Sequence, residues 1–175
     1  MADQNQQGVT ARLLVVMGVA GCGKTTIGGA LADARGGQFL DGDAFHTPNN
    51  IHKMSHGIPL TDEDRWPWLD RFASEMSELD GTVVGGCSAL RRSYRDRIRN
   101  ALGEPVLFIH LTGSPELIAS RMAKRTGHFM PMSLLRSQFE TLEAPGAGEN
   151  AIAVDISGTT EQIVDDISTK LAATG

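Results

Sequence analysis

One octapeptide near the start of the chain constrains its fold more than any other feature. Residues 18–25 read Gly-Val-Ala-Gly-Cys-Gly-Lys-Thr and match the phosphate-binding pattern G-x-x-x-x-G-K-[ST] at every fixed position. The apolar run 13–17 precedes it, and residues 26–32 follow in a helix-compatible pattern. A strand that enters such a loop and a helix that leaves it turn backbone N–H groups and a helix dipole toward phosphate oxygens. The alternative, a glycine-rich turn that matches by chance, would not require these flanks.

The motif assigns roles to the residues around the start of this helix. We expect Lys24 to reach the β- and γ-phosphates of a nucleotide and the Thr25 hydroxyl to ligate Mg²⁺. The motif therefore predicts a nucleotide and Mg²⁺ as ligands. The expected phosphate-binding set is Gly18, Gly21, Cys22, Gly23, Lys24, Thr25 and Thr26.

The charge and cysteine content narrow the class of partner. The formal net charge of -5 argues against a nucleic-acid partner, because binding a phosphate backbone requires a basic face. The two cysteines form no Cys-x-x-Cys pair, and no apolar stretch is long enough to cross a membrane, which favours a cytoplasmic protein. The polar residues 1–10 contain no Lys or Arg and predict a loose tail rather than a signal peptide. Residues 11–175 are then expected to form a single domain.

Apolar runs alternate with amphipathic segments along the rest of the chain, which predicts an α/β fold with a parallel sheet. Two polar segments, 41–63 and 126–131, interrupt this alternation and are expected to be loops that are either functional or disordered. Both are expected at the carboxyl ends of the strands, where ligands bind. Strands are expected at 13–17, 38–40, 82–87, 105–111 and 151–156, and helices at 24–35, 64–79, 90–102, 115–125, 133–142 and 160–173.

Two carboxylates follow the second expected strand. Asp41 and Asp43 are two residues apart, so an extended chain would project both to the same side. One could then help to hold Mg²⁺ through water while the other accepts a proton from a substrate hydroxyl. The alternative is an Asx-type turn with solvated carboxylates. The position after a phosphate loop, at the substrate end of the sheet, favours the site.

Arginines cluster in two places. Arg121 and Arg125 are four residues apart and share one helix face just before a Gly and Pro break, which predicts a lid over about 121–135 that carries arginines onto ATP. A solvated basic helix end is the alternative. The second cluster comprises Arg91, Arg92, Arg95 and Arg99. Repulsion among these like charges calls for a bound carboxylate or phosphate, or for a salt-bridged solvent face.

Longer blocks around these residues resemble the gluconokinase family. The stretches LDGDAFH at 40–46 and NIHKMSHGIPLTDEDRWPWL at 50–69 are similar to the substrate segment of bacterial gluconokinases. CSALRRSYRD at 87–96, GHFM at 127–130 and QFETLE at 138–143 resemble further blocks of that family, and the similarity runs from about Leu13 to the end. One departure is the pair Gly85-Gly86, where bulkier strand residues are expected; glycine there predicts a bend or a close approach.

The resemblance implies an ATP-dependent kinase that converts D-gluconate to 6-phospho-D-gluconate by in-line phosphoryl transfer. It implies the fold of nucleoside-monophosphate and shikimate kinases: a P-loop NTPase with a five-stranded parallel sheet, helices on both faces and a lid. It also implies a substrate segment over about 41–80, and a homodimer.

The same resemblance implies roles for individual residues. Asp41 would support Mg²⁺, and Asp43 would hold the reacting hydroxyl. The implied catalytic residues are Lys24, Asp43, Arg121 and Arg125. The implied gluconate contacts are Asp43, His46, Arg65, Ser88, Arg95, His128 and Gln138, and the adenine is expected beside Ser157 and Thr159.

Two other functions stay open on the sequence. A kinase of this kind could act on another small anionic acceptor, such as shikimate or a nucleotide. A nucleotide switch or regulatory ATP-binding module is the second alternative, although the base-reading Asn-Lys-x-Asp of GTPases does not occur in the sequence.

Overall fold

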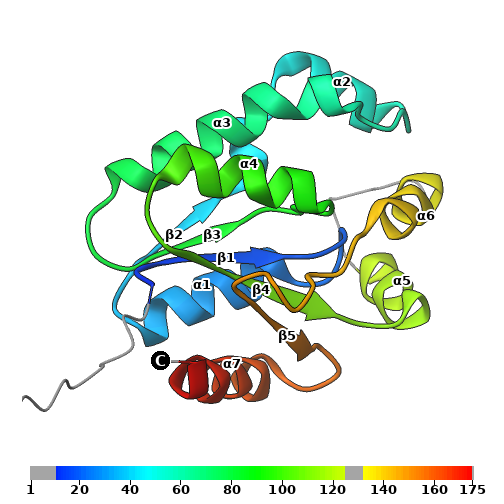
Figure 1. Cartoon of the computed structure of the whole chain (residues 1–175). Helices are drawn as coiled ribbons and strands as arrows, with labels where there is room; N and C mark the ends of the chain where they lie inside the picture. The colour runs from blue at the N-terminus through cyan, green and yellow to red at the C-terminus, as the bar shows by residue number, and fades with distance from the viewer. Residues whose placement is uncertain (1–10, 125–131, 175) are drawn as a thin grey trace, which may run out of the picture.

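Five parallel strands form one sheet in the order β2-β3-β1-β4-β5 (Figure 1). The computed structural model describes residues 11–124 and 132–174. The five-stranded parallel sheet that the family resemblance implies is confirmed. The strands are β1 (Leu13–Met17), β2 (Gln38–Asp41), β3 (Val83–Gly86), β4 (Val106–Thr112) and β5 (Ala151–Asp155).

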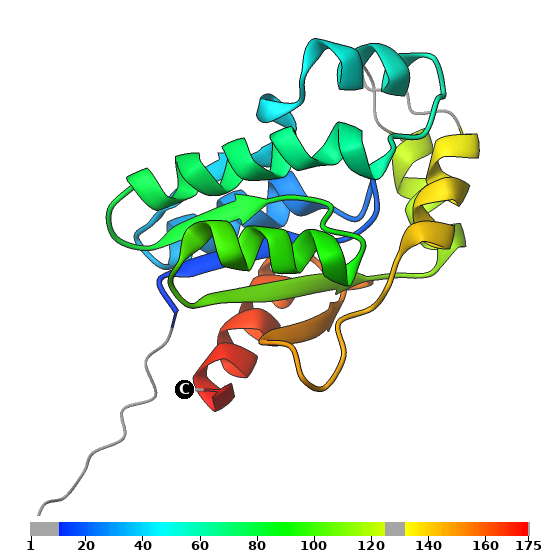
Figure 2. The ribbon, with the colours of Figure 1, turned by 45° about the horizontal axis from the view of Figure 1, so that its top comes forward.

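Helices cover both faces of this sheet, as the resemblance implies (Figures 1 and 2). Within the described residues the helices are α1 (Lys24–Ala34), the 3-10 helix η1 (Gly42–Phe45), α2 (Pro48–Ser55), α3 (Asp62–Glu78), α4 (Arg92–Leu102), α5 (Pro115–Ala123), α6 (Met132–Thr141) and α7 (Thr160–Thr174). Of these, α1 and α7 lie on one face of the sheet, α3 and α4 lie on the other, and α5 and α6 lie beyond the carboxyl ends of the strands.

The core lies on both sides of β1, whose five residues are all fully buried. A central parallel strand covered on both faces needs an unbroken apolar run, which is why no polar residue alternates in it. On one face, α3 approaches β3 so closely that a Cβ on Gly85 would lie 2.5 Å from Cζ of Phe72. The close approach predicted at the glycine pair is confirmed, and it brings α3 down onto the sheet.

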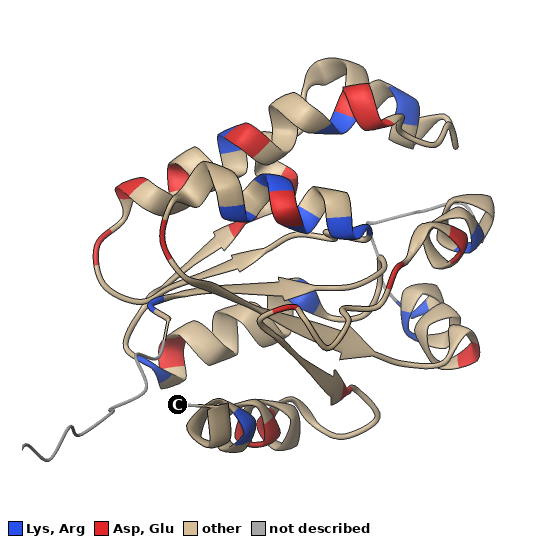
Figure 3. Cartoon of the chain, viewed as in Figure 1, with Lys and Arg blue, Asp and Glu red and all other residues tan. Residues whose placement is uncertain are grey.

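Arginines are interspersed with Asp and Glu residues along α3 and α4 (Figure 3). Arg97 of α4 pairs with Asp70 of α3, with Nε 2.7 Å from Oδ1. No helix within residues 11–124 and 132–174 is both long and apolar enough to span a bilayer.

The segment 41–63, expected to be a loop, is largely helical, so this prediction is wrong. Thr47 caps α2 by accepting a hydrogen bond from Asn50 N, and Pro48 follows at the first helical position. A capping box of Thr61 and Asp64 starts α3 at Asp62, two residues before the expected start. The cap at Thr47 thus starts α2, whose sequence is largely polar, and the capping box fixes the start of α3 ahead of its apolar stripe.

Candidate active site

The phosphate loop joins β1 to α1 through residues 18–23. Gly21 and Gly23 have φ of 80° and 98°, in the left-handed region that favours glycine. A Cβ on Gly21 would also lie 2.5 Å from Cγ of Met122 in α5. Gly23 caps α1 without a side chain, and the first turn of the helix holds no acidic residue. The N–H groups of this turn therefore keep their hydrogen-bonding capacity for an anion.

Lys24 lies over this loop. Its Nζ donates to the carbonyl oxygens of Gly18 and Val19 at 3.0 and 3.1 Å. Thr25 and Thr26 are exposed at the helix start, whereas the Cys22 side chain is buried. The start of α1 thus supplies an ammonium group, two exposed hydroxyls and helical N–H groups.

The ends of β2 and β3 lie beside the loop. In the sheet register Asp41 pairs with Gly86, which in turn pairs with Val16. The carbonyl of Ser88 accepts a hydrogen bond from Gly18 N at 3.2 Å. Burial raises the pKa of the Cys87 thiol to about 12, and the charges of Asp43, Lys24 and Asp41 also act on this thiol. The end of β3 lies against both neighbours, since a Cβ on Gly86 would lie 3.8 Å from Cβ of Lys24 and a Cβ on Gly42 would lie 3.4 Å from Cβ of Cys87.

The two aspartates do not lie on an extended chain, so that premise is wrong. Asp41 caps η1, which begins at Gly42, and accepts a hydrogen bond from Asp43 N at 2.9 Å. The turn expected under the alternative interpretation is thus present, although it lies at the carboxyl end of β2. The Asp43 side chain is 72% exposed, so its carboxylate is accessible to a ligand.

Three of the expected substrate contacts come from different elements, since His46 follows η1, Arg65 is in α3 and Ser88 follows β3. His46 is stacked on Trp68, with ring centroids 4.0 Å apart, and its Nε2 is 3.8 Å from Asp43 Oδ1. Burial, followed by the charge of Arg65, lowers the pKa of His46 to about 4, so the ring is neutral at pH 7. Arg65 donates to Leu60 O at 2.6 Å. Ser88, the third, is half-buried against the loop.

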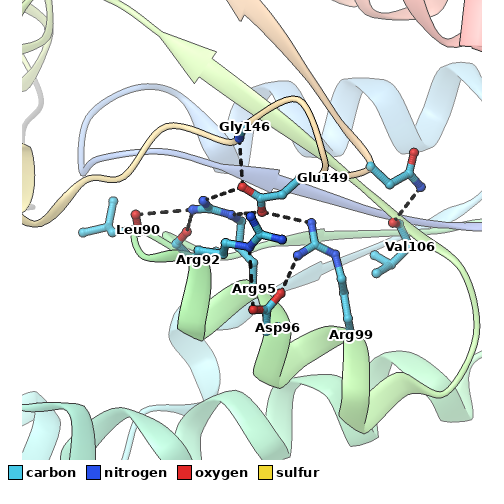
Figure 4. A network of polar contacts seen from close by, with 10 residues as sticks. Leu90, Arg92, Arg95, Asp96, Arg99, Val106, Gly146 and Glu149 are labelled. Atoms are coloured by element: carbon cyan, nitrogen blue, oxygen red, sulfur yellow. Dashed lines mark hydrogen bonds and ion pairs between the residues drawn. The ribbon is translucent and has the colours of Figure 1, made fainter.

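Arg95 was expected to bind the substrate, and the structure contradicts this (Figure 4). Its side chain is fully buried, and it donates from Nε and Nη2 to Glu149 at 2.8 and 3.0 Å. Its Nη1 donates to Ala89 O and Leu90 O. Because these bonds engage all three guanidinium nitrogens inside the protein, Arg95 holds the β3–α4 connection in place instead.

The anion expected beside the α4 arginines is supplied by the chain itself. Arg99 donates to Asp96 at 3.0 Å and to Glu149 at 3.2 Å, and Arg92 lies 3.8 Å from Asp96 (Figure 4). The hydrogen bond from Arg95 is the main cause that lowers the pKa of Glu149 to about 2. The alternative of a salt-bridged face therefore describes Arg92 and Arg99, whereas the Arg95–Glu149 pair is buried and does not face solvent.

Gln138, another expected substrate contact, touches the phosphate loop. Its Oε1 accepts a hydrogen bond from Ala20 N at 2.6 Å. Arg125 and His128 lie outside the described residues, as do the tail 1–10 and part of the expected lid.

A cavity of about 340 Å³ opens beside the loop and brings together residues of α1, α5 and α7. Arg121 lines it and donates from Nη2 to Ile156 O at 2.5 Å. Thr159 lines it as well, whereas Ser157 is not among its lining residues and donates to Asp155. A larger open hollow of about 400 Å³, next to Glu104 and Asn150, contains none of the expected site residues.

Two residues near the site were missed or misjudged in the sequence. Asn50 is fully buried and contacts His46, and nothing in the sequence distinguishes it from a loop asparagine. Trp68, which carries no signal of a site role in the sequence, positions η1 by donating from Nε1 to Gly42 O at 2.8 Å.

Curated relatives share much of this sequence. A family model described as an AAA domain matches residues 13–145. A gluconokinase from Gluconobacter oxydans (strain 621H) is 48% identical over 155 residues, covering 86% of this chain and 86% of that protein. The thermosensitive gluconokinase of Escherichia coli (strain K12) is 47% identical and covers 85% of this chain and 83% of that protein.

Solved structures share the fold. The crystal structure of a gluconokinase from Sinorhizobium meliloti 1021 matches with a TM-score of 0.84 at 49% identity, covering 92% of this chain and 91% of that chain. Shikimate kinase from Aquifex aeolicus vf5 matches with a TM-score of 0.58 at 16% identity, covering 91% and 96%. The similarity to this shikimate kinase concerns the fold alone.

Proposed function

The chain belongs to the gluconokinase family, and we propose that it transfers the γ-phosphoryl group of ATP to D-gluconate, giving 6-phospho-D-gluconate. The observation that carries this proposal is the position of the phosphate loop. Its open helix end lies beside Asp41, Asp43 and Ser88, at the carboxyl ends of three adjacent strands. A phosphate donor and a hydroxyl-rich acceptor can meet there.

The nucleotide half of the site is built from the loop and the neighbouring cavity. Lys24 and the N–H groups of the first turn of α1 would bind the β- and γ-phosphates, and the cavity lined by Arg121 and Thr159 would take the remainder of ATP. The Thr25 hydroxyl and the Asp41 carboxylate supply hard oxygen ligands that suit Mg²⁺. Bound Mg²⁺ would neutralise charge that develops on the phosphates.

The acceptor half is built around Asp43. The 6-hydroxyl oxygen of gluconate would form a bond to the γ-phosphorus in line with the bond from that phosphorus to the β–γ bridging oxygen, which breaks to release ADP. The hydroxyl proton would pass to the exposed Asp43 carboxylate. With Arg95 buried, Arg65 is the cation we propose for the gluconate carboxylate.

Further features of the family resemblance extend the proposal. We expect residues 11–175 to act as one domain, with a substrate segment over about 41–80 and a lid over about 121–135 that carries Arg121, Arg125 and His128. We also expect a homodimer in the cytoplasm. Light scattering on the purified protein would check the dimer, since a monomer mass would exclude it.

A panel of acceptors tests the activity. With ATP and Mg²⁺, we expect ADP release to depend on D-gluconate, and 6-phospho-D-gluconate to accumulate in equal amount. Phosphorylation of shikimate or a nucleotide without gluconate turnover would favour a different small-molecule kinase. Tight ATP binding without any acceptor-dependent turnover would favour the regulatory module.

A further inference from the structure

Asn50 has a fixed amide orientation inside the protein. Its side chain is fully buried, and Nδ2 donates to the backbone carbonyl of Asp64 at 2.9 Å. If the amide were flipped, Oδ1 would face that carbonyl, and two acceptors would repel each other. The Asp64 carbonyl therefore decides which end of the Asn50 amide is the nitrogen.

This orientation decides where the proton of His46 lies. The second Nδ2 proton of Asn50 is directed to His46 Nδ1, which is 3.2 Å away. A nitrogen that accepts a hydrogen bond carries no proton, so the neutral imidazole has its proton on Nε2. Trp68 stacks on the ring with 20° between the planes and so fixes the plane of the imidazole.

The protonated nitrogen faces Asp43. His46 Nε2 lies 3.8 Å from Asp43 Oδ1, which is too long for a direct hydrogen bond. A hydroxyl group placed next to both can bridge them, because its oxygen accepts from Nε2–H while its own proton is donated to the carboxylate. The Nε2–H donor of His46 and the carboxylate acceptor of Asp43 together fit a single hydroxyl group in one orientation.

We propose that Asn50 is a positioning residue that holds His46 as the Nε2–H tautomer, so that His46 and Asp43 together orient the acceptor hydroxyl. This rests on the proposed function for the identity of the hydroxyl, but the tautomer itself does not. The arrangement also costs stability, because Asn50 Oδ1 is buried and has no hydrogen-bond partner among the described residues. An apolar residue of similar size would avoid that cost, which favours a role in the site for the amide donors.

The first test measures the tautomer without turnover. In the full chain labelled with ¹⁵N-histidine, the two-bond ¹⁵N–¹H correlations of the His46 ring distinguish Nε2–H from Nδ1–H and from imidazolium. We expect the Nε2–H pattern at pH 7 in the absence of substrate. Either of the other two patterns overturns the proposal, whatever the enzyme phosphorylates.

The second test compares Asn50→Leu with Asn49→Leu. Asn49 is exposed and donates to the Asp64 side chain at 3.1 Å, so its loss perturbs the same neighbour without touching His46. We expect Asn50→Leu to mix the two tautomers and to lower kcat/KM for the acceptor by about 10²-fold. KM for ATP should change by less than about twofold, and Asn49→Leu should match the wild type. Wild-type kinetics in a folded Asn50→Leu enzyme would overturn the positioning role.

A third pair of variants covers the case in which Asn50→Leu does not fold. His46→Gln keeps an amide donor near the Nε2 position, whereas His46→Asn moves it toward Nδ1. We expect His46→Gln to retain at least about tenfold more kcat/KM than His46→Asn. Equal loss in both would contradict the role of the Nε2 proton. A wild type that shows the Nε2–H pattern but does not phosphorylate gluconate would instead contradict the proposed function alone.

Discussion

Lys24 and Arg95 both lie close to the carboxyl ends of the central strands, but their charges have different uses. The Lys24 ammonium rests on two loop carbonyls, which are neutral acceptors that a phosphate can replace. Arg95 is paired with the buried carboxylate of Glu149. Moving the guanidinium of Arg95 away from Glu149 to bind a ligand would leave both buried charges uncompensated. Burial and the charge of the partner therefore separate a ligand-binding cation from a structural one.

Replacing Lys24 tests the first of these roles. We expect Lys24→Ala to abolish gluconate-dependent ADP release, because the variant loses the cation that offsets charge on the β- and γ-phosphates. Lys170→Ala is the matched control, since it removes a lysine of α7 whose Nζ donates to Ala153 O. A coupled assay of ADP release measures the turnover of both variants. Turnover of Lys24→Ala at the wild-type rate would contradict the assignment of the phosphate loop.

Replacing Asp43 tests the proposed base. Asp43→Asn keeps the size of the side chain but cannot take the hydroxyl proton, so we expect kcat to fall by about 10²-fold or more. Saturation curves for gluconate and ATP separate the two possible roles. An effect confined to KM would make Asp43 a binding residue only.

Between the elements, single hydrogen bonds connect the phosphate loop to its surroundings. Gln138 of α6 accepts from Ala20 N, and Ser88 after β3 accepts from Gly18 N. The two N–H groups that donate these bonds, those of Gly18 and Ala20, are at the start of the loop. The loop is thus held from two sides, and the N–H groups of the first turn of α1 stay available for an anion such as phosphate.

The link from α6 has a measurable consequence for nucleotide binding. Gln138→Leu removes the acceptor for Ala20 N and should weaken the preorganisation of the loop by about 1 kcal/mol. We expect KM for ATP to rise about fivefold while KM for gluconate changes little. Glu140→Leu, an exposed position on the same helix, is the control. A rise in KM for gluconate with no change for ATP would restore Gln138 to its expected role as a substrate contact.

Local signals explain which elements could be predicted from the sequence. The unbroken apolar run predicts β1 at its observed bounds, Leu13–Met17, because a strand buried on both faces has no other pattern. By contrast, α2 depends on the Thr47 cap and on buried Asn50, and its polar composition resembles a loop. The phosphate loop was predictable because one short segment contains all of its chemistry.

Across the whole molecule, the residues that could not be placed are those whose partners are remote in sequence. The arginine spacing on α4 correctly indicates a need for anions, but Glu149 lies in the connection to β5 and carries no motif. It also accepts from Gly146 N at 2.9 Å, so one carboxylate joins α4 to the segment that precedes β5 (Figure 4). Only the folded sheet, with β4 and β5 adjacent, brings these segments together.

That carboxylate makes the stability of the chain depend on pH in a defined window. Hydrogen bonds lower the pKa of Glu149 from 4.5 to about 2, and the bond from Arg95 is the largest cause. Because the folded pKa is the lower one, this contribution is complete above about pH 4.5 and is lost as the pH falls toward 2, which corresponds to about 3 kcal/mol. Glu149→Gln should therefore flatten the fall in the free energy of unfolding across this window. It should also destabilise the protein at pH 7 by about 3 kcal/mol or more, because Arg95 stays buried without its anion.

Glu104→Gln is the matched control for this measurement. Glu104 pairs with Arg12 at 2.7 Å, but the two side chains are 35% and 33% exposed. Water screens such a pair, so its loss should cost less than about 1 kcal/mol at pH 7. Urea titrations of both variants between pH 2 and pH 7 separate the cases. If Glu149→Gln retained the wild-type slope below pH 4.5, the buried pair would not be the group that limits acid stability, and the connection before β5 would have to be held by its backbone contacts, such as the bond from Glu143 N to Leu90 O.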